Sequence, residues 1–463
     1  MAEMPIGFIV GAPNEGRNTS ADILINQTHE PLFYYDSNLN LIPVLVRSWN
    51  ISKNSKECIF FLKEGVLFHN GKEMTADDVI YSLKYASGFY SQNNNFFDQI
   101  DKKNILEKCG KYCFRIKSER IGSQLANLLA GANYKIVPYG SIRRGESPPG
   151  TGPFKIEGWE DGKITLVRFE SYHIKNGVGN INKCIFVFLA KDSAIQEYKR
   201  GNVDDLFEYV LDDNTLSTLN GKKIVMPMYS FAYIGMNIRM HPFDRREIRL
   251  AMQHAVDRDA LYNKHFPEHL PINGIIPRGM IGSTETGPYF SYNLRNAKKL
   301  LRTKIAGVEF WIRDKDWNED FVADLKSQLS IVGININVRH VNSKDFFDSY
   351  FSRKQQMFFI VMGADYKDPE SILSSFRSDS LDNDVGIKDK IVDMKIGKLA
   401  GTFNRDERAK EVKNITELIM DHAAIVPIYQ KVAHTLYNDN IKNVNLSSSW
   451  HEDIRINDYV KYY

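Results

Sequence analysis

The sequence contains no run of eighteen or more apolar residues, so no segment is expected to cross a membrane as a helix. It also has no Gly-x-Ser-x-Gly, no P-loop, no Gly-x-Gly-x-x-Gly and no His-Glu-x-x-His. The common local signatures of hydrolases, nucleotide-binding enzymes and zinc peptidases are therefore missing. The formal net charge is +3, and no block of Lys and Arg is large enough to cover a face. A nucleic-acid partner is therefore not expected.

Cysteine is scarce, with four residues in the chain. Cys109 and Cys113 flank a predicted hairpin tip, where a disulfide is sterically allowed and would suit an oxidising compartment. The alternative is four reduced thiols, with Cys58 and Cys184 buried on strands as small apolar side chains. The spacing is wrong for a structural zinc site. We expect the disulfide.

The composition is that of a globular protein, with 43% hydrophobic and 12% aromatic residues. A chain of 463 residues is too long for one hydrophobic core, so we expect two or three domains. The first five residues, Met-Ala-Glu-Met-Pro, begin neither a basic nor an apolar stretch, and they do not have the pattern of a secretory signal peptide.

The most informative stretch runs from Pro43 to Lys84. An apolar run, an alternating strand and a tight turn precede a segment that is expected to be helical. Thr75 and Asp78 predict the helix start, since Thr-x-x-Asp resembles a capping box in which the hydroxyl accepts from a free backbone N–H.

The order and spacing of these signals resemble the signature segment of the extracytoplasmic solute-binding proteins of family 5, which bind oligopeptides, dipeptides or nickel for ABC importers. The matching residues in this segment are Pro43, Leu45, Trp49, Gly65, Val66, Phe68, His69, Gly71, Thr75, Ala76, Asp78 and Val79. Further motifs follow in the order of the family, at residues 150–154, 237–258, 292–301 and 426–429. Two departures are His173, where the family usually has Trp, and the missing Leu-Asp-Pro motif near the first helix.

The resemblance implies an α/β, two-lobed periplasmic-binding-protein fold (type II, cluster C) with an extra small α+β domain inserted in the first lobe. The implied divisions are lobe I over 1–42, 150–229 and 431–463, the inserted domain over 43–149, and lobe II over 230–430. It also implies a periplasmic or cell-envelope protein whose signal segment is absent from this sequence, working as a monomer with the transmembrane subunits of an ABC permease.

Asp365 is the residue that we expect to lie closest to function. It follows a strand predicted over 357–362, and open α/β sheets bind ligands at the carboxyl ends of their strands. The run from Ala364 to Pro369 resembles a turn of peptide-binding family members, whose Asp forms a salt bridge with the peptide α-amino group. A buried ammonium group needs such a fixed carboxylate. The alternative is a turn Asp that accepts hydrogen bonds from its own backbone.

The remaining candidate ligand-binding residues are strand and loop positions. They are Tyr366, Met362, Gly363, Tyr229, Phe231, Tyr233 and Gly152. The strand around 229–237 and the loop at Gly152 could share main-chain hydrogen bonds with an extended peptide. The three aromatic residues alternate along the strand, and core packing is an equally good explanation for them. Met362 stands where relatives often carry an aromatic residue.

Three functions compete at this point. Capture of a short peptide by hinge closure, with its α-amino group on Asp365, is our main hypothesis, and it needs no cofactor, bound metal or catalytic residue. Binding of nickel, a metallophore or haem on the same fold is the alternative, for which His241, His254, His265 and His269 form the only loose histidine grouping. A hydrolase would need a nucleophile and base, which the sequence does not reveal.

Overall fold

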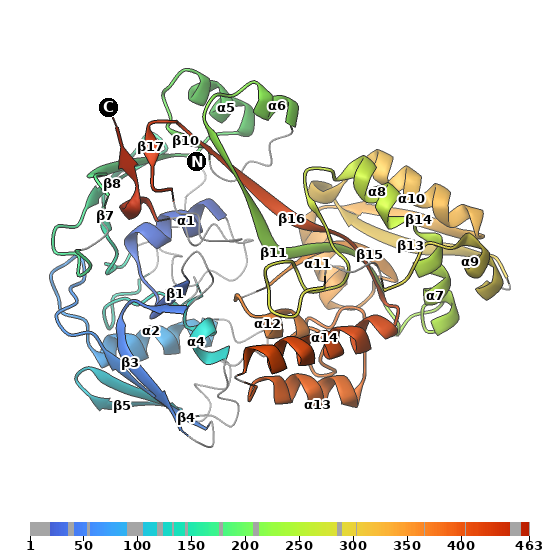
Figure 1. Ribbon diagram of the computed structural model, residues 1–463, viewed down its shortest axis with the longest axis horizontal. Coiled ribbons are helices and arrows are strands. Elements are labelled where there is room, and N and C mark those ends of the chain that lie inside the picture. The colour runs from blue at the N-terminus through green and yellow to red at the C-terminus, as the bar shows by residue number, and fades with distance from the viewer. Residues whose placement is uncertain are drawn as a thin grey trace. The chain divides into compact units, whose positions relative to one another are not determined.

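The computed structural model describes residues 19–35, 41–52, 56–89, 105–117, 124–131, 134–143, 147–175, 179–206, 213–284, 289–301, 303–364, 366–402, 404–444 and 455–462. The chain divides into two compact units (Figure 1). Unit 1 comprises residues 1–226 and 433–463, and unit 2 comprises residues 227–432. The chain passes between them within β11 (Lys222–Met236) and β16 (Ile425–Tyr437). A separate small domain over 43–149 stays a prediction.

Unit 1 contains an antiparallel sheet of four strands in the order β3-β4-β6-β5. Its elements are β3 (Val46–Ile51), β4 (Glu57–Leu62), α2 (Ala76–Phe89), β5 (Leu106–Gly110) and β6 (Cys113–Lys117). The predicted disulfide is confirmed: Cys109 and Cys113 are bonded across the β5–β6 turn. The carbonyl groups of this turn accept hydrogen bonds from the N–H groups of Leu62 and Ala76 (both 2.8 Å). The hairpin tip is therefore tied to the strand and helix beside it.

The second sheet of unit 1 has three antiparallel strands that pack against α1. They are β7 (Phe154–Glu160), β8 (Lys163–Arg168) and β9 (Lys183–Val187), and the helix is α1 (Thr19–Thr28). The other elements are β1 (Phe33–Tyr35), β2 (Leu41–Pro43), α4 (Gln124–Leu128), α5 (Lys191–Lys199), β10 (Asp205–Leu206), α6 (Asp213–Ser217), β17 (Ile441–Lys442), η6 (Ile456–Asp458) and β18 (Val460–Lys461).

Two local predictions in unit 1 are wrong in detail. The sequence predicts a first helix from about 21 to 33, but the helix ends at Thr28, because the residue before Pro31 is disfavoured in helical conformation. At the start of α2, the Thr75 hydroxyl donates to Asp78 Oδ2 (2.8 Å), and the same oxygen accepts the Thr75 N–H (2.8 Å). The acid, not the hydroxyl, is therefore the acceptor. The sequence also predicts a strand over 6–12, which lies outside the described residues.

The main sheet follows the order β10-β16-β11-β15-β13-β14, with β12 beside β16. Strand β15 runs antiparallel to β11 and parallel to β13. The remaining strands are β12 (Leu270–Pro271), β13 (Ile305–Arg313), β14 (Ile334–Val341) and β15 (Met357–Gly363). The sequence predicts a strand over 308–312, a helix over 321–331 and a strand over 334–340, with Gly333 ending the helix. The structure confirms this unit as β13, α10 and β14, and Gly333 has a φ of 88°.

One face of this sheet is buried under helices that contribute to a hydrophobic core of unit 2. These are α7 (Arg246–Ala255), α8 (Arg258–His265), α9 (Leu294–Leu300) and α10 (Glu319–Ile331). The other helices of unit 2 are η4 (Asp314–Asp316), α11 (Ser343–Phe351), α12 (Pro369–Ser374), α13 (Lys390–Leu399) and α14 (Arg405–Asp421). Figure 1 shows α12, α13 and α14 packed together. Within the described ranges, no helix has the length and apolar character needed to cross a membrane.

We predict that Gly235→Ala lowers the free energy of unfolding by about 1–3 kcal/mol, because a Cβ at this position would lie 2.3 Å from the ring of the buried Phe358. Urea denaturation measures the change. Gly158→Ala on β7 is the matched control, since its added Cβ meets no atom within 4 Å. Equal stability of the two variants would contradict the proposed clash.

We further predict that replacing Cys109 and Cys113 together by Ser costs about 2 kcal/mol of stability, the value expected for a disulfide that closes a short loop. Denaturant unfolding with and without a thiol reductant measures it. The reductant should bring the parent to the level of the variant and leave the variant unchanged. Burial raises the pKa of the Cys58 and Cys184 thiols to about 12, so they stay unreactive. A reductant effect on the variant would contradict this assignment.

Candidate functional site

The antiparallel pairing of β11 with β15 brings four of the predicted residues together. Phe231 lies opposite Met362, and Ser230 lies opposite Gly363. One residue further, the Ala364 N–H donates to the carbonyl of Tyr229 (2.9 Å), so the ladder continues to the end of β15. Met362 is half-buried and Gly363 is exposed.

The turn that follows β15 is described except for one residue. Asp365 lies outside the described residues. Tyr366 is half-buried, and its carbonyl accepts the N–H of Asp368 (2.8 Å). Asp368 caps α12, because its Oδ1 accepts the N–H of Glu370 (2.9 Å) and Pro369 occupies the first helical position. The turn therefore begins at the carboxyl end of a strand, as the sequence predicts, and it ends at a capped helix.

The aromatic residues of β11 form a packed layer. Phe231 and Tyr233 are wholly buried and stack with their ring centroids 5.3 Å apart. The Tyr233 hydroxyl donates to the carboxylate of Asp384, which also accepts the hydroxyl of Tyr350 (2.8 Å). Burial raises the pKa of Asp384 despite these hydrogen bonds. For Phe231 and Tyr233, the structure therefore favours the core-packing alternative over direct ligand contact.

The backbone of β11 takes part in the hydrogen bonding of the main sheet. The strand lies between β16 and β15, and residues 230–236 pair with β15 along their length. In this structure, residues 230–236 have β15 along one edge, and their pairing with an extended ligand stays a prediction.

Gly152 belongs to unit 1, where its backbone groups hold the loop in place. Its N–H donates to the carbonyl of Thr28 (3.0 Å), and its carbonyl lies 3.0 Å from His69 Nε2. A Cβ on Gly152 would lie 2.5 Å from the Thr28 backbone, so this close approach requires glycine. Four positions before Gly152, the carbonyl of Pro148 lies 2.9 Å from His29 Nε2. Burial lowers the pKa of His29 to about 3, which keeps the ring neutral.

Sequence reasoning missed a buried polar cluster in unit 1. Glu30 accepts a hydrogen bond from the Tyr172 hydroxyl (2.7 Å) and lies 2.8 Å from His173 Nε2. Burial, and then the charge of Glu30, raise the pKa of Tyr172. The replacement of the usual Trp by His173 was the one available signal. Its partner lies 143 positions earlier in the chain, beyond the reach of local patterns.

Sequence reasoning also missed a buried charged cluster at the end of the β15–α12 turn, formed by Asp368, Glu370 and Arg408. Arg408 on α14 donates to both carboxylate oxygens of Asp368, at 2.6 and 3.2 Å, and all three charged residues of the cluster, including Glu370, are buried. The Asp-Pro pair at 368–369 is a local signal for a helix start that was not recognised from the sequence, and nothing local to it indicates a buried guanidinium partner.

The histidines named for a metal or haem function have separate partners. The pairs are His241 Nδ1 with Asp244 (3.5 Å), His254 Nδ1 with the Ser291 carbonyl (2.8 Å), His265 Nε2 with Asp324 (2.8 Å) and His269 Nδ1 with the Val432 N–H (3.5 Å). Among the residues that the structure describes, no group of three or more His, Cys, Asp or Glu is placed to hold a metal ion.

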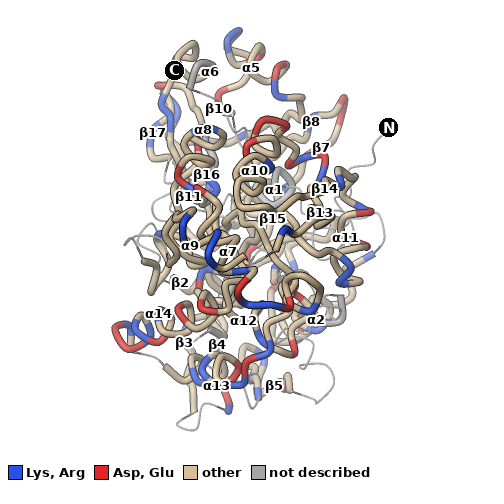
Figure 2. Tube along the Cα trace, turned by 90° about the vertical axis from the view of Figure 1, so that its right-hand side faces the viewer, with Lys and Arg blue, Asp and Glu red and all other residues tan. Residues whose placement is uncertain are grey.

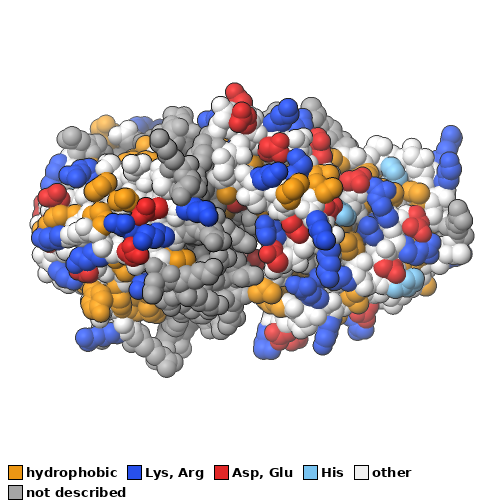
Figure 3. All heavy atoms as spheres, turned by 90° about the horizontal axis from the view of Figure 1, so that it is seen from below, with side chains coloured by type: hydrophobic (Ala, Val, Ile, Leu, Met, Phe, Trp, Pro, Cys, Tyr) orange, Lys and Arg blue, Asp and Glu red, His pale blue; other side chains and the backbone are white. Residues whose placement is uncertain are grey.

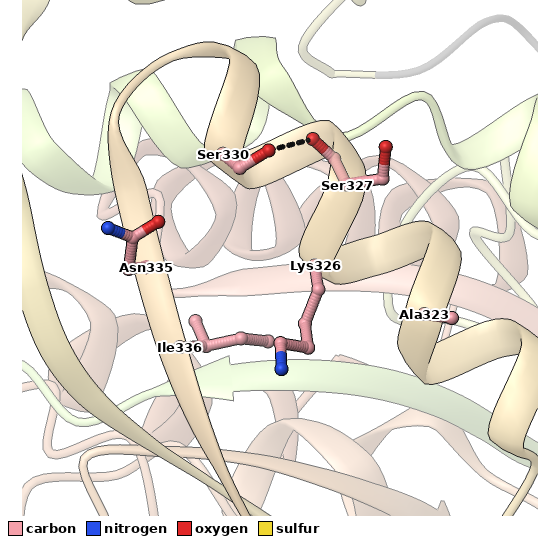
Figure 4. Close-up of a pocket in the computed structure, with 6 residues that line it drawn as sticks. All are labelled: Ala323, Lys326, Ser327, Ser330, Asn335 and Ile336. Carbon is pink, nitrogen blue, oxygen red and sulfur yellow. Dashed lines mark hydrogen bonds between the residues drawn. The ribbon is translucent and has the colours of Figure 1, made fainter.

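The surface offers two further observations. Figure 2 shows acidic and basic residues mixed along α13 and α14, and Figure 3 shows the same mixture over the face seen from below. A hollow of about 420 Å³ lies between α10 and β14, lined by Ala323, Lys326, Ser327, Ser330, Asn335 and Ile336 (Figure 4). Five of these six residues are exposed, and none was predicted to bind a ligand. We therefore do not assign the hollow to the function.

Comparison with known proteins gives a consistent result. The sequence matches the profile of the bacterial extracellular solute-binding proteins, family 5 Middle, over residues 40–384. The dipeptide-binding protein DppE of Bacillus subtilis is 21% identical over 447 residues, covering 87% of this chain and 81% of DppE.

Two solved structures share the fold. One is the ABC transporter-associated periplasmic binding protein DppA of Helicobacter pylori in complex with the peptide STSA, with a TM-score of 0.79, 17% identity, and coverage of 99% of this chain and 96% of DppA. The other is AgaA of A. tumefaciens in complex with agropinic acid, with a TM-score of 0.79, 20% identity and 98% coverage of both chains. The expected two-lobed periplasmic-binding-protein fold is thereby confirmed. With the profile matching well over half of its length, the chain belongs to the bacterial extracellular solute-binding proteins of family 5 and is a solute-binding protein, not an enzyme.

Proposed function

We propose that the chain captures a short peptide between its two units and delivers it to the transmembrane subunits of an ABC importer. The names of DppE, a dipeptide-binding protein, and of DppA, solved with a peptide, support this choice of ligand. We further propose that it works as a monomer in the periplasm or cell envelope.

The turn between β15 and α12 is the observation that carries the proposal. It lies at the carboxyl end of a strand in an α/β sheet, where ligands of such folds bind. We assign Asp365, within this turn, as the carboxylate that pairs with the peptide α-amino group. Met362, Gly363 and Tyr366 flank it in the chain, and Tyr229 is linked to the turn through the Ala364 N–H. In this proposal Phe231, Tyr233 and Gly152 help to hold the surrounding structure in place, and they do not pair with the peptide α-amino group.

Capture by hinge closure is supported by the two strands that carry the chain between the units. The crossings fall at 226–227 within β11 and at 432–433 within β16. Changes in a few backbone angles at such positions are enough to move two rigid bodies. Closure would expel water around the ligand and strengthen an ammonium–carboxylate pair, since the dielectric screening falls.

We predict that Asp365→Asn weakens the binding of a peptide with a free amino terminus by about 30-fold or more, because removing one partner of a buried charge pair costs about 2–5 kcal/mol. Titration calorimetry with a defined set of di- to pentapeptides measures the affinity. Mass spectrometry of molecules that co-purify with the parent identifies the natural ligand.

Asp421→Asn is the matched control, since Asp421 is an exposed carboxylate (75% side-chain exposure) that pairs with Arg246 at the end of α14. It should bind like the parent. N-acetylation of the peptide should weaken binding to the parent as Asp365→Asn does. Equal affinity for capped and free peptides, or unchanged binding by Asp365→Asn, would overturn the anchor. A non-peptide ligand, as in the AgaA complex, would overturn the peptide assignment.

A further inference from the structure

The segment that joins β15 to α12 is fixed at both ends. Its first residue, Ala364, is held by the hydrogen bond to the Tyr229 carbonyl (2.9 Å). Its last, Asp368, uses one carboxylate both to cap α12 and to accept the guanidinium of Arg408. The position of Asp368 therefore sets where the segment ends.

Arg408 is placed to control that position. An arginine has five N–H donor sites, and five acceptors surround this one. They are Asp368 Oδ1 (2.6 Å), Asp368 Oδ2 (3.2 Å), Glu370 Oε2 (3.2 Å), the Leu399 carbonyl (2.5 Å) and the Thr402 carbonyl (3.4 Å). The residue is only 3% exposed. Arg408 therefore links the turn to the end of α13 and to its own helix, α14, in one defined orientation.

A buried ion pair of this kind contributes more to geometry than to stability. Taking two charges out of water offsets most of the attraction between them, whereas the bidentate fork allows only one relative orientation. If stability alone were needed, apolar side chains of similar size would serve as well. The cluster lies beside the segment that the proposed function assigns to the ligand.

We propose that Arg408 is a positioning residue for ligand binding, which acts through Asp368 to hold the segment between β15 and α12 in its binding geometry. This inference rests on the proposed function, because it gives Arg408 a role only if that segment contacts the amino terminus of a peptide. Arg408 itself does not touch the ligand.

Arg408→Lys and Asp368→Asn test the inference. Lysine keeps the charge but offers three donors and no fork, and asparagine keeps the helix cap but removes the charge. Both variants should fold cooperatively and bind the best free-amino peptide about 10-fold or more weakly than the parent. Their affinity for the N-acetylated peptide should change little, so the preference for a free amino terminus shrinks.

Arg249→Met is the matched control. Arg249 is equally buried in unit 2 (5% exposed), and it donates to the carbonyls of Phe243 (2.6 Å) and His422 (2.8 Å). The change should lower stability but leave the ratio of the two affinities unchanged. A parent that binds no peptide would overturn the proposed function and this inference together. A parent that prefers free peptides, with the same preference in folded Arg408→Lys and Asp368→Asn, would overturn the inference alone.

Glu370 allows a second test of the arrangement around Arg408. The buried carboxylates of Asp368 and Glu370 both accept hydrogen bonds from the Arg408 guanidinium. Burial and then the neighbouring charge of Asp368 raise the pKa of Glu370 to about 7, against the opposing effects of Arg408 and Arg377. Arg377 is itself paired with Asp379 and contacts the Asp393 carbonyl on α13. Because the folded protein holds the Glu370 proton more tightly, this proton stabilises it fully below pH 4.5, and the effect is lost as the pH rises through 7.

Glu370→Gln should remove this pH dependence while keeping the Arg408–Asp368 pair. Relative to the variant, the unfolding constant of the parent should rise by about two orders of magnitude between pH 5 and pH 8. Denaturant titrations across that range measure it. The variant should also keep the preference for free peptides. Parallel pH profiles in the two proteins would overturn the assignment of this pH dependence to Glu370, and loss of the preference in Glu370→Gln would overturn the claim that Arg408 acts through Asp368.

Discussion

Seven residue pairs join β11 to β15 in antiparallel register, from Ser230–Gly363 at one end to Met236–Met357 at the other. This ladder decides which side chains of β11 face the helices α7 to α10 and which form the aromatic layer on the opposite face. A slip by one residue would exchange the two faces, so burial on both sides fixes the register. The end of β15, and with it the turn that carries the proposed amino-group anchor, takes its place from this pairing.

Buried carboxylates recur in both units, and each has partners from distant parts of the chain. Glu30 contacts a tyrosine and a histidine, Asp384 accepts from two tyrosines, and Asp368 binds a guanidinium. An unpaired carboxylate in these places would lose its hydration without compensation. Each cluster therefore ties separate elements together with defined geometry, and the cluster at Asp368 lies next to the segment assigned to the ligand.

Close approach of backbones supplies a second constraint. The ring of Phe358 occupies the space that a side chain on Gly235 would need, and Gly152 brings its loop against the backbone of Thr28. At both positions a neighbouring group leaves no room for a side chain, and neither glycine has a positive φ that would itself require glycine. Gly152 illustrates the difference: its motif identified the family, but its backbone groups are used to hold the loop to α1 and His69.

The sequence by itself determined the elements whose signals are local. The β13-α10-β14 unit and the β5–β6 hairpin with its disulfide followed from periodicity and turn residues within a few positions, and ordered motifs identified the family. Only the tertiary structure decided that Phe231 is core, that His173 pairs with Glu30, and that Arg408 holds Asp368 from 40 positions away. The reason is physical: burial and ion pairing depend on which distant segments meet, and no local pattern records that.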